Sequence, residues 1–282
     1  MFENIRIEKG SSPENLLDLV RSVGWNQTLS DCGEMVLRND AVCFFAMDGD
    51  QAIGSAAAKF YGGKTMGYIN MVVVREPYRG HHIATRMLQT LMDYLKDFKT
   101  LRLYATEAGS HVYSKLGFTT YAMMHKYFRQ GQHREVSPNI RPLLDSDLDK
   151  AAEIDAAAFG VERKNILKYF YRNGRSISFK LAGKDGVPSG FVIGREGPSS
   201  RHAAEVIAEN ESDALDLITA VEQAGKTAGQ TLIILPDEQK SMVRLALDSG
   251  FETSTSLVCM DYGIPGPKPA RNYYGMLGGD FG

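Results

Sequence analysis

The first half of the chain alternates between short apolar runs and stretches with apolar residues at helical spacing. Strand-like runs cover 41–48, 52–61 and 65–74. The turn residues Asp48-Gly49-Asp50 and Gly62-Gly63 separate them, which predicts an antiparallel meander. The end of the third run is almost wholly apolar, as expected of a central strand that is buried on both faces.

Helical spacing flanks this meander. Ser12 and Pro13 form a capped helix start, and Gly24 provides the matching stop. A second short helix is expected at 31–37. After the meander, a helix is predicted to run to about Phe98, with one apolar face made of Ile83, Met87, Leu88, Leu91, Met92 and Leu95. A strand at 101–106, a short helix that carries Tyr113 and a strand at 119–128 complete the first half.

The second half repeats this order. A polar stretch with glycine and proline at 129–140 is typical of a linker. Helices, a strand meander, a long helix near 212–227, a strand, a short helix and a final strand follow, and Gly250-Phe251 corresponds to Gly117-Phe118. We therefore expect an α/β (α+β) chain with two copies of one fold, at 1–130 and 141–282, joined by a linker at 131–140.

Composition narrows the possible functions. The 282 residues are 43% hydrophobic and 23% charged, with a net charge of −2, so the chain lacks the basic field that nucleic-acid binding requires. Three scattered cysteines are too few for a disulfide framework and fit a reducing compartment. No apolar run is long enough to span a bilayer, and the N-terminus lacks a signal-peptide core. These features predict a cytoplasmic protein that binds neither nucleic acid nor membrane.

The segment 79–84 joins the apolar strand to the long helix, at the helix N-terminus. Unpaired backbone N–H groups and the positive end of the helix dipole point outward there. A glycine allows the backbone to approach a ligand closely, and an adjacent arginine adds positive charge. This arrangement is typical of a phosphate-binding cradle.

Three stretches together, MVVV, YRGHHIA and LYATEAGSHVYSKLGF, resemble the GCN5-related N-acetyltransferase (GNAT) superfamily. Its phosphate motif is Gln/Arg-x-x-Gly-x-Gly/Ala. Arg79 and Ala84 match that motif, whereas His82 replaces its middle glycine. The early Gly24-Trp25-Asn26 and the long second half look like the two-domain YitH-like subgroup. The resemblance implies tandem GNAT-like folds, each with a mixed, mostly antiparallel sheet flanked by helices.

The resemblance also implies roles in binding acetyl-CoA as a co-substrate. The pantetheine arm would pair with the exposed edge of the apolar strand at Val72, Val73 and Val74. The pyrophosphate would be held by seven consecutive residues, Arg79, Gly80, His81, His82, Ile83, Ala84 and Thr85. Backbone N–H groups near Val74 would polarise the thioester carbonyl. The phenol of Tyr113 would protonate the departing thiolate of CoA.

Several of these roles have structural alternatives. His82 could donate to a phosphate, could contribute only its backbone, or could weaken cofactor binding by its bulk. Tyr113 could be an ordinary surface or core aromatic. Thr106 could contact the cofactor arm or merely cap the following helix. The adjacent His81 and His82 face different directions on a helix and do not form a metal pair, so no metal site is expected.

The acceptor site is less well marked. Trp25, the single tryptophan, and Asn26 could line an acceptor pocket, although Trp25 could equally belong to the core. Arg163 could pair with an acceptor carboxylate or cap a surface. The general base stays unassigned, because the strand before the cradle carries no carboxylate and the remaining candidates are Asp31, Glu107 and His111.

The chemistry of the first half is not repeated in the second. Glu209, Glu211 and Asp213 surround the corresponding helix start and would repel a pyrophosphate. Ala246 occupies the position that corresponds to Tyr113. We therefore expect only the first half to bind acetyl-CoA.

These features predict an N-acetyltransferase in which the primary amine of a small molecule attacks acetyl-CoA directly. One alternative is a protein or peptide lysine acetyltransferase, and another is a non-catalytic CoA-binding or interaction module. The sequence leaves the acceptor and the oligomeric state open.

Overall fold

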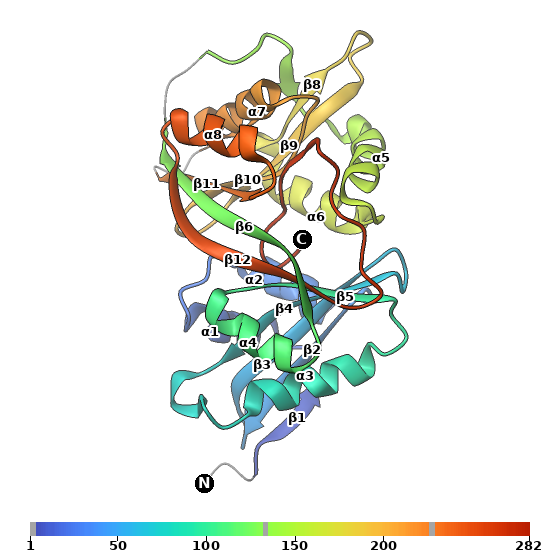
Figure 1. Ribbon diagram of the computed structural model, residues 1–282, viewed down its shortest axis with the longest axis vertical. Coiled ribbons are helices and arrows are strands. Elements are labelled where there is room, and N and C mark those ends of the chain that lie inside the picture. The colour runs from blue at the N-terminus through green and yellow to red at the C-terminus, as the bar shows by residue number, and fades with distance from the viewer. Residues whose placement is uncertain (1–3, 132–134, 226–228) are drawn as a thin grey trace. The chain divides into compact units, whose positions relative to one another are not determined.

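The computed structural model describes residues 4–131, 135–225 and 229–282, and they form two compact units (Figure 1). Unit 1 comprises Met1–Leu103, Val112–Phe118 and Asp261–Pro265. Unit 2 comprises Tyr104–His111, Thr119–Met260 and Gly266–Gly282. Each unit thus includes a segment from the other half of the chain.

Unit 1 is built on a sheet with the strand order β1-β2-β3-β4-β5, in which β4 and β5 are parallel and the other neighbours are antiparallel. The elements of the first half are β1 (Arg6–Lys9), α1 (Pro13–Arg21), α2 (Leu29–Val36), β2 (Ala41–Asp48), β3 (Gln51–Tyr61), β4 (Met66–Val74), a 3₁₀ turn (Glu76–Tyr78), α3 (Ile83–Tyr94), β5 (Thr100–Ala105) and α4 (Glu107–Lys115).

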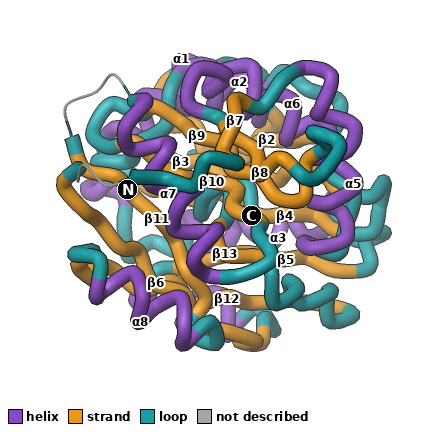
Figure 2. The backbone as a smooth tube through the Cα atoms, turned by 90° about the horizontal axis from the view of Figure 1, so that it is seen from above, coloured by secondary structure: helices purple, strands orange, loops and turns teal. Residues whose placement is uncertain are grey.

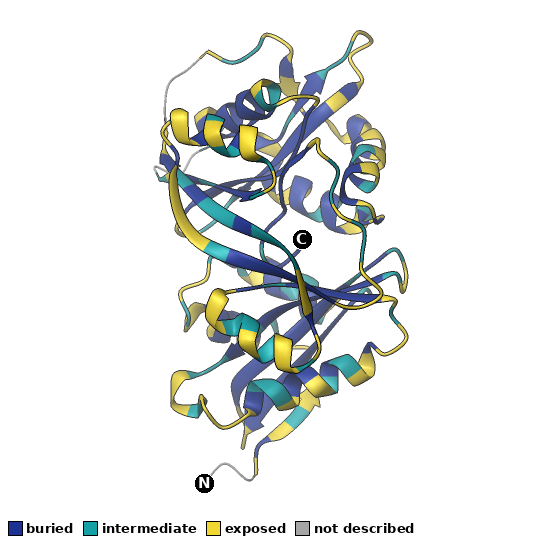
Figure 3. Ribbon diagram, viewed as in Figure 1, coloured by how far each residue is buried: buried dark blue, intermediate teal, exposed yellow. Residues whose placement is uncertain are grey.

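Helices cover both faces of the unit 1 sheet. Gly54 of β3 lies against α3, where an added Cβ would meet the Cε of Met87 at 3.0 Å. Lys59 of the same strand donates from Nζ to the Glu34 carboxylate of α2 at 3.2 Å. Because side chains alternate along a strand, these two positions, five residues apart, face opposite sides. The helix α3 turns its buried residues toward the sheet and its exposed ones outward (Figure 3).

A buried ion pair fixes the end of strand β12 (Glu252–Gly263) in unit 1. Arg102 of β5 donates from Nε and Nη2 to the two carboxylate oxygens of Asp261, at 2.8 and 2.9 Å. The Arg102 side chain is completely buried and that of Asp261 is 5% exposed. The end of β12 is therefore anchored in unit 1.

Unit 2 repeats the same architecture, with the strand order β7-β8-β9-β10-β11-β6 and β13 as a further partner of β10. Only β10 and β11 are parallel in this unit. Its other elements are β6 (Thr119–Gln130), β7 (Ile140–Pro142), α5 (Leu148–Phe159), α6 (Lys164–Gly174), β8 (Phe179–Ala182), β9 (Pro188–Glu196), β10 (Arg201–Ile207), α7 (Glu211–Ala224), β11 (Gln230–Pro236), α8 (Lys240–Asp248) and β13 (Tyr273–Gly275), with 3₁₀ turns at Asp145–Asp147 and Arg175–Ile177.

The predicted fold class is confirmed, since the strands of each unit pair in a mixed, mostly antiparallel arrangement flanked by helices (Figure 2). The meander strands agree with their sequence patterns to within a residue. Three short strands were not expected: β1, β7 and β13 have three or four residues each, too few for an alternating pattern to show. The helix α3 ends at Tyr94 rather than Phe98.

The predicted linker partly falls at 132–134, outside the described residues; strand β6 continues to Gln130 before it. The predicted end of the long helix near 227 also falls outside them, beyond α7. All three cysteines are buried free thiols. Within the described residues, no helix is long and apolar enough to cross a membrane, and no cluster of histidine, cysteine and carboxylate side chains could hold a metal ion.

Candidate functional site

The loop before α3 forms an open concavity of backbone N–H groups. Gly80 and His82 both adopt left-handed backbone conformations, with φ of 82° and 58°. Alternation between left-handed and other conformations turns successive N–H groups toward one point, which creates an anion-binding nest. Gly80, His81 and His82 are all exposed. No heavy atom lies within 4 Å of a Cβ built on Gly80, so the space above it is open.

The N-terminus of α3 carries no side-chain cap. Its N-cap residue, His82, makes no side-chain capping hydrogen bond, and its first turn carries no acidic residue. Arg79 donates from Nε to the Val74 carbonyl at 3.0 Å, which ties the loop to the end of β4. A cationic side chain, free N–H groups of the first turn and the helix dipole therefore coincide, as phosphate binding requires.

The left-handed conformation of His82 explains why the family motif has a glycine there. Such a backbone places Cβ against the following carbonyl and costs about 1–2 kcal/mol in a residue other than glycine. Glycine gives back about 0.5–1 kcal/mol through the greater entropy of the unfolded chain. The strain at His82 therefore comes from the backbone conformation of the loop and not from the imidazole ring.

We expect His82→Gly to raise the free energy of unfolding by up to about 1 kcal/mol. The control is His81→Gly, because His81 has no left-handed backbone, and this change should not stabilise the protein. Urea unfolding measures both. Calorimetry with His82→Ala separates the remaining alternatives: an unchanged Kd for acetyl-CoA means that only the backbone binds, and a weaker one means that the imidazole donates.

The strand edge beside the cradle lacks a strand partner. The parallel pairing of β4 with β5 ends at Ile69 and Leu103, so within the described residues no strand pairs with Met71–Val74 on that side. Met71 has a positive φ of 46°, and its carbonyl accepts from Ser55 Oγ at 2.7 Å. The pairing of β3 and β4 shifts register here, which marks a β-bulge that re-aims the backbone beyond it.

The residues predicted to bind acetyl-CoA differ in how deeply their side chains are buried. Val73 and Ile83 have buried side chains, 3% and 2% exposed, so only their backbones can reach a ligand. Val72 and Val74 are half-buried, as are Ala84 and Thr85. The bulge at Met71 and its hydrogen bond with Ser55 were not expected from the sequence, since a left-handed methionine leaves no sequence signal.

The end of α4 sets the position of Tyr113. Gly117 is left-handed, with φ of 91°; its N–H donates to the Ser114 carbonyl and the Phe118 N–H donates to the Tyr113 carbonyl. This pattern is a Schellman motif, which brings the residue after the glycine back onto the last turn of the helix. The rings of Tyr113 and Phe118 accordingly meet edge to face, with centroids 5.8 Å apart. The Tyr-x-x-x-Gly-Phe pattern thus fixes the ring.

The surroundings of Tyr113 keep its phenol protonated. Desolvation raises the pKa of this hydroxyl well above its ordinary value of 10. The residue is only partly buried, so the ring still has an open side. A phenol that stays protonated suits a proton donor.

Thr106 caps the helix α4. Its Oγ1 accepts from the Gly109 N–H at 3.2 Å, which is the capping alternative considered for this residue. The side chain is exposed, and its contact with the cofactor stays a prediction.

Trp25 lies at the surface rather than in the core. Its side chain is 38% exposed, directly after the left-handed Gly24 that ends α1. Asn26 beside it is half-buried. Asp31, a candidate base, accepts from both the backbone N–H and the hydroxyl of Thr28 in a capping box, so its carboxylate is already engaged. Among the described residues of this region, the geometry therefore identifies no carboxylate as the general base.

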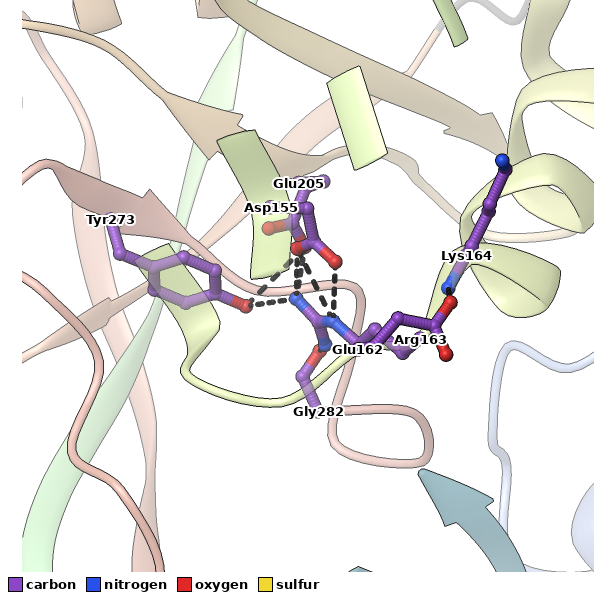
Figure 4. Close-up of polar contacts among 7 residues, drawn as sticks. All are labelled: Asp155, Glu162, Arg163, Lys164, Glu205, Tyr273 and Gly282. Carbon is purple, nitrogen blue, oxygen red and sulfur yellow. Dashed lines mark hydrogen bonds and ion pairs between the residues drawn. The ribbon is translucent and has the colours of Figure 1, made fainter. Parts of the chain in front are cut away.

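Arg163 lies in a buried cluster in unit 2 (Figure 4). Its guanidinium donates to Asp155, to Glu205 at 2.8 Å, to the Tyr273 hydroxyl at 3.1 Å and to the Gly282 carbonyl at 2.7 Å. The side chain is completely buried. This position leaves no open side for an acceptor carboxylate, and Arg163 is therefore left out of the acceptor site proposed below.

Unit 2 has the corresponding helix start and the corresponding Gly-Phe turn, but it lacks the uncapped helix start and the phenol of unit 1. Asn210 caps α7 by accepting from the Asp213 N–H at 3.0 Å, so that helix start is already satisfied. The Schellman motif recurs at Gly250, where the Phe251 N–H donates to the Ala246 carbonyl. Alanine thus stands where unit 1 has the phenol.

Comparison with known proteins agrees with this picture. The model of the acetyltransferase (GNAT) family matches residues 11–118, and that of an acetyltransferase (GNAT) domain matches 151–275. The uncharacterized N-acetyltransferase YitH of Bacillus subtilis is 24% identical over 213 residues, 74% of each chain. N-alpha-acetyltransferase 30 of Schizosaccharomyces pombe is 32% identical over 96 residues, which span 31% of this chain and 64% of that protein.

Among solved structures, a Pyrococcus horikoshii protein of proposed acetyltransferase function superposes with a TM-score of 0.82 at 19% identity, covering 100% of this chain and 97% of its own. This likeness shows the fold. The two family matches lie in tandem and coincide with the two halves of the repeat. The chain therefore belongs to the GNAT family, as a two-domain N-acetyltransferase of the YitH-like subgroup.

Proposed function

We propose that this enzyme transfers the acetyl group of acetyl-CoA to the primary amine of a small molecule. The observation that carries the proposal is the coincidence, in unit 1, of an uncapped α3 N-terminus with the unpaired edge of β4. The nest from Arg79 to Thr85 would hold the pyrophosphate, and the backbone at Val72–Val74 would pair with the pantetheine arm.

The proposed reaction is a direct transfer. The neutral amine attacks the thioester carbonyl carbon, a C–N bond forms, and the C–S bond breaks. Backbone N–H groups beyond the Met71 bulge would stabilise the negative charge on the carbonyl oxygen. Tyr113 would give its proton to the departing thiolate, and the new ammonium group would lose one proton, which restores the phenol through solvent. Trp25 and Asn26 would line the acceptor side.

We further propose that unit 1 alone binds acetyl-CoA. In unit 2, β10 and β11 pair only at Arg201–His202 and then separate, and β13 lies along β10 and contacts β11 (Figure 2). The chain's own strand thus occupies the position that the pantetheine arm would take. The capped α7, with Glu211 and Asp213 in its first turn, supports the same conclusion.

Calorimetry with acetyl-CoA tests this proposal. We expect one site per chain with micromolar affinity, about −8 kcal/mol. Arg79→Glu should weaken binding about ten- to hundredfold, because a charge-assisted contact becomes a repulsion. Lys184→Glu makes the same kind of change at an exposed turn of unit 2 and should leave Kd unchanged. Two sites per chain, or equal effects of both variants, would refute the assignment.

A peptide or protein amine is the second candidate acceptor. The similarity to N-alpha-acetyltransferase 30 favours it, although that match spans only 31% of this chain. CoA release measured with a panel of small amines, and with peptides carrying either a free N-terminus or a lysine, decides between them. Turnover with peptides alone would replace the small-molecule acceptor. A cytoplasmic location is proposed from the three reduced, buried cysteines.

A further inference from the structure

Unit 2 contains a cavity of about 640 Å³ beside the end of β11 and strand β13. This volume lies within the range of small-molecule sites, about 300–1,000 Å³. Residues from the loop after β10, the starts of α7 and α8, strands β6 and β13, and the segment before β13 line it. Acetyl-CoA is excluded as its ligand by the position of β13 and by the capped α7, so the cavity needs another explanation.

The walls of this cavity are held in place by hydrogen bonds. Tyr273 lines the cavity, while its hydroxyl is bound by Arg163 and donates to Glu205 at 3.3 Å within the buried cluster (Figure 4). The side-chain amide of Gln239 donates to the carbonyls of Arg271 and Tyr273, at 2.8 and 3.2 Å. The cavity is therefore a preformed site rather than a gap between mobile side chains.

Charged side chains of both signs line the cavity and are unpaired. Three are cationic and three anionic: Lys240, Lys268, Arg271, Glu209, Glu211 and Glu238. Among the residues that the structure describes, none of these six side chains takes part in an ion pair. Five of these six residues are exposed and Glu211 is half-buried, so charges of both signs are available to a ligand in the open cavity.

The rest of the lining is apolar and aromatic. Tyr121, Tyr274, Met124, Pro236 and Pro269 contribute rings and aliphatic surface. Tyr274 is 5% exposed, so its ring is part of a packed wall. A ligand that matched this lining would carry an ammonium group, a carboxylate and an apolar body between them.

We propose that the cavity of unit 2 binds a small zwitterion with an apolar body, of the size of a short aromatic peptide. Its ammonium group would lie toward the glutamates and its carboxylate toward Lys240, Lys268 and Arg271. This site is separate from the acetyl-CoA site, and it gives the second unit a ligand of its own.

Calorimetry with phenylalanyl-phenylalanine tests the proposal on the full chain. We expect one site, with binding weakened about three- to tenfold by N-acetylation of the probe and, separately, by conversion of its carboxylate to an amide. Lys240→Ala and Glu211→Gln should each weaken the parent probe by a similar factor. Arg244→Ala, on α8 but outside the cavity, should have no effect.

The Arg79→Glu variant separates this proposal from the proposed function, because it should weaken acetyl-CoA binding about ten- to hundredfold and leave the Kd of the dipeptide unchanged. Absence of binding at about 5 mM probe, which corresponds to about −3 kcal/mol, would overturn the proposal. So would a loss of affinity for only one of the two blocked probes, since a zwitterion needs both charges. Binding that survives both cavity variants but is lost in Trp25→Ala would place the probe elsewhere and would also overturn it.

Discussion

Replacement of Tyr113 by phenylalanine is expected to lower kcat about 10²–10⁴-fold while acetyl-CoA binds with unchanged affinity. The phenol would protonate the thiolate of CoA, and phenylalanine cannot. The ring itself should keep its place, because the Schellman motif and the edge-to-face contact with Phe118 do not involve the hydroxyl. Steady-state kinetics and calorimetry on the same variant measure the two quantities.

The pH dependence of kcat provides a second readout. Desolvation raises the pKa of the Tyr113 phenol, so the proton donor stays loaded through neutral and mildly alkaline pH. The parent enzyme should therefore lose kcat only when pH rises above 10, and the variant should lack that alkaline decline. Tyr262→Phe is the matched control, since Tyr262 packs on Phe118 and its hydroxyl has no assigned role. Equal kcat values for parent and Tyr113→Phe would remove the proton-donor assignment.

Replacement of Asp261 by asparagine is expected to destabilise unit 1 by about 3–5 kcal/mol. Arg102 would keep its charge in a completely buried position and lose its bidentate partner. Urea unfolding followed by tryptophan fluorescence reports this unit selectively, because the single tryptophan, Trp25, lies in it.

Two controls distinguish a buried charge from a general effect of the substitution. Asp248→Asn removes the acid of an exposed pair with Arg244 in unit 2 and should change stability by less than about 1 kcal/mol. The double variant Arg102→Met with Asp261→Leu should recover most of the loss, since no unpaired charge remains. If Asp261→Asn unfolds at the same urea concentration as the parent, the ion pair does not hold the end of β12 in unit 1.

Local patterns predicted much of the fold. The meander strands, the capped helix at Pro13 and the amphipathic α3 all follow from side-chain periodicity and turn residues, which depend on a few neighbouring positions. The repeat was visible for the same reason, because Gly117-Phe118 and Gly250-Phe251 end the same kind of helix in the same way. The loop before α3, which we propose as the phosphate cradle, was recognisable from the local sequence.

Other features exist only in the tertiary structure. Met71 and His82 have left-handed backbones, which methionine and histidine disfavour. Their surroundings impose this conformation, so no sequence pattern predicts it. The burial of Arg163 depends on Asp155 and Glu205, which come from two different elements.

The sequence by itself determined the repeated fold and the alanine at position 246 in place of a tyrosine, because both depend on the order of neighbouring residues. Only the tertiary structure decided which segment completes each unit. Arg102 binds Asp261, which is 159 residues away in the sequence. Strand β13 pairs with β10, about 70 residues away. Over such separations the chain itself does not determine which segments meet, so packing and charge do.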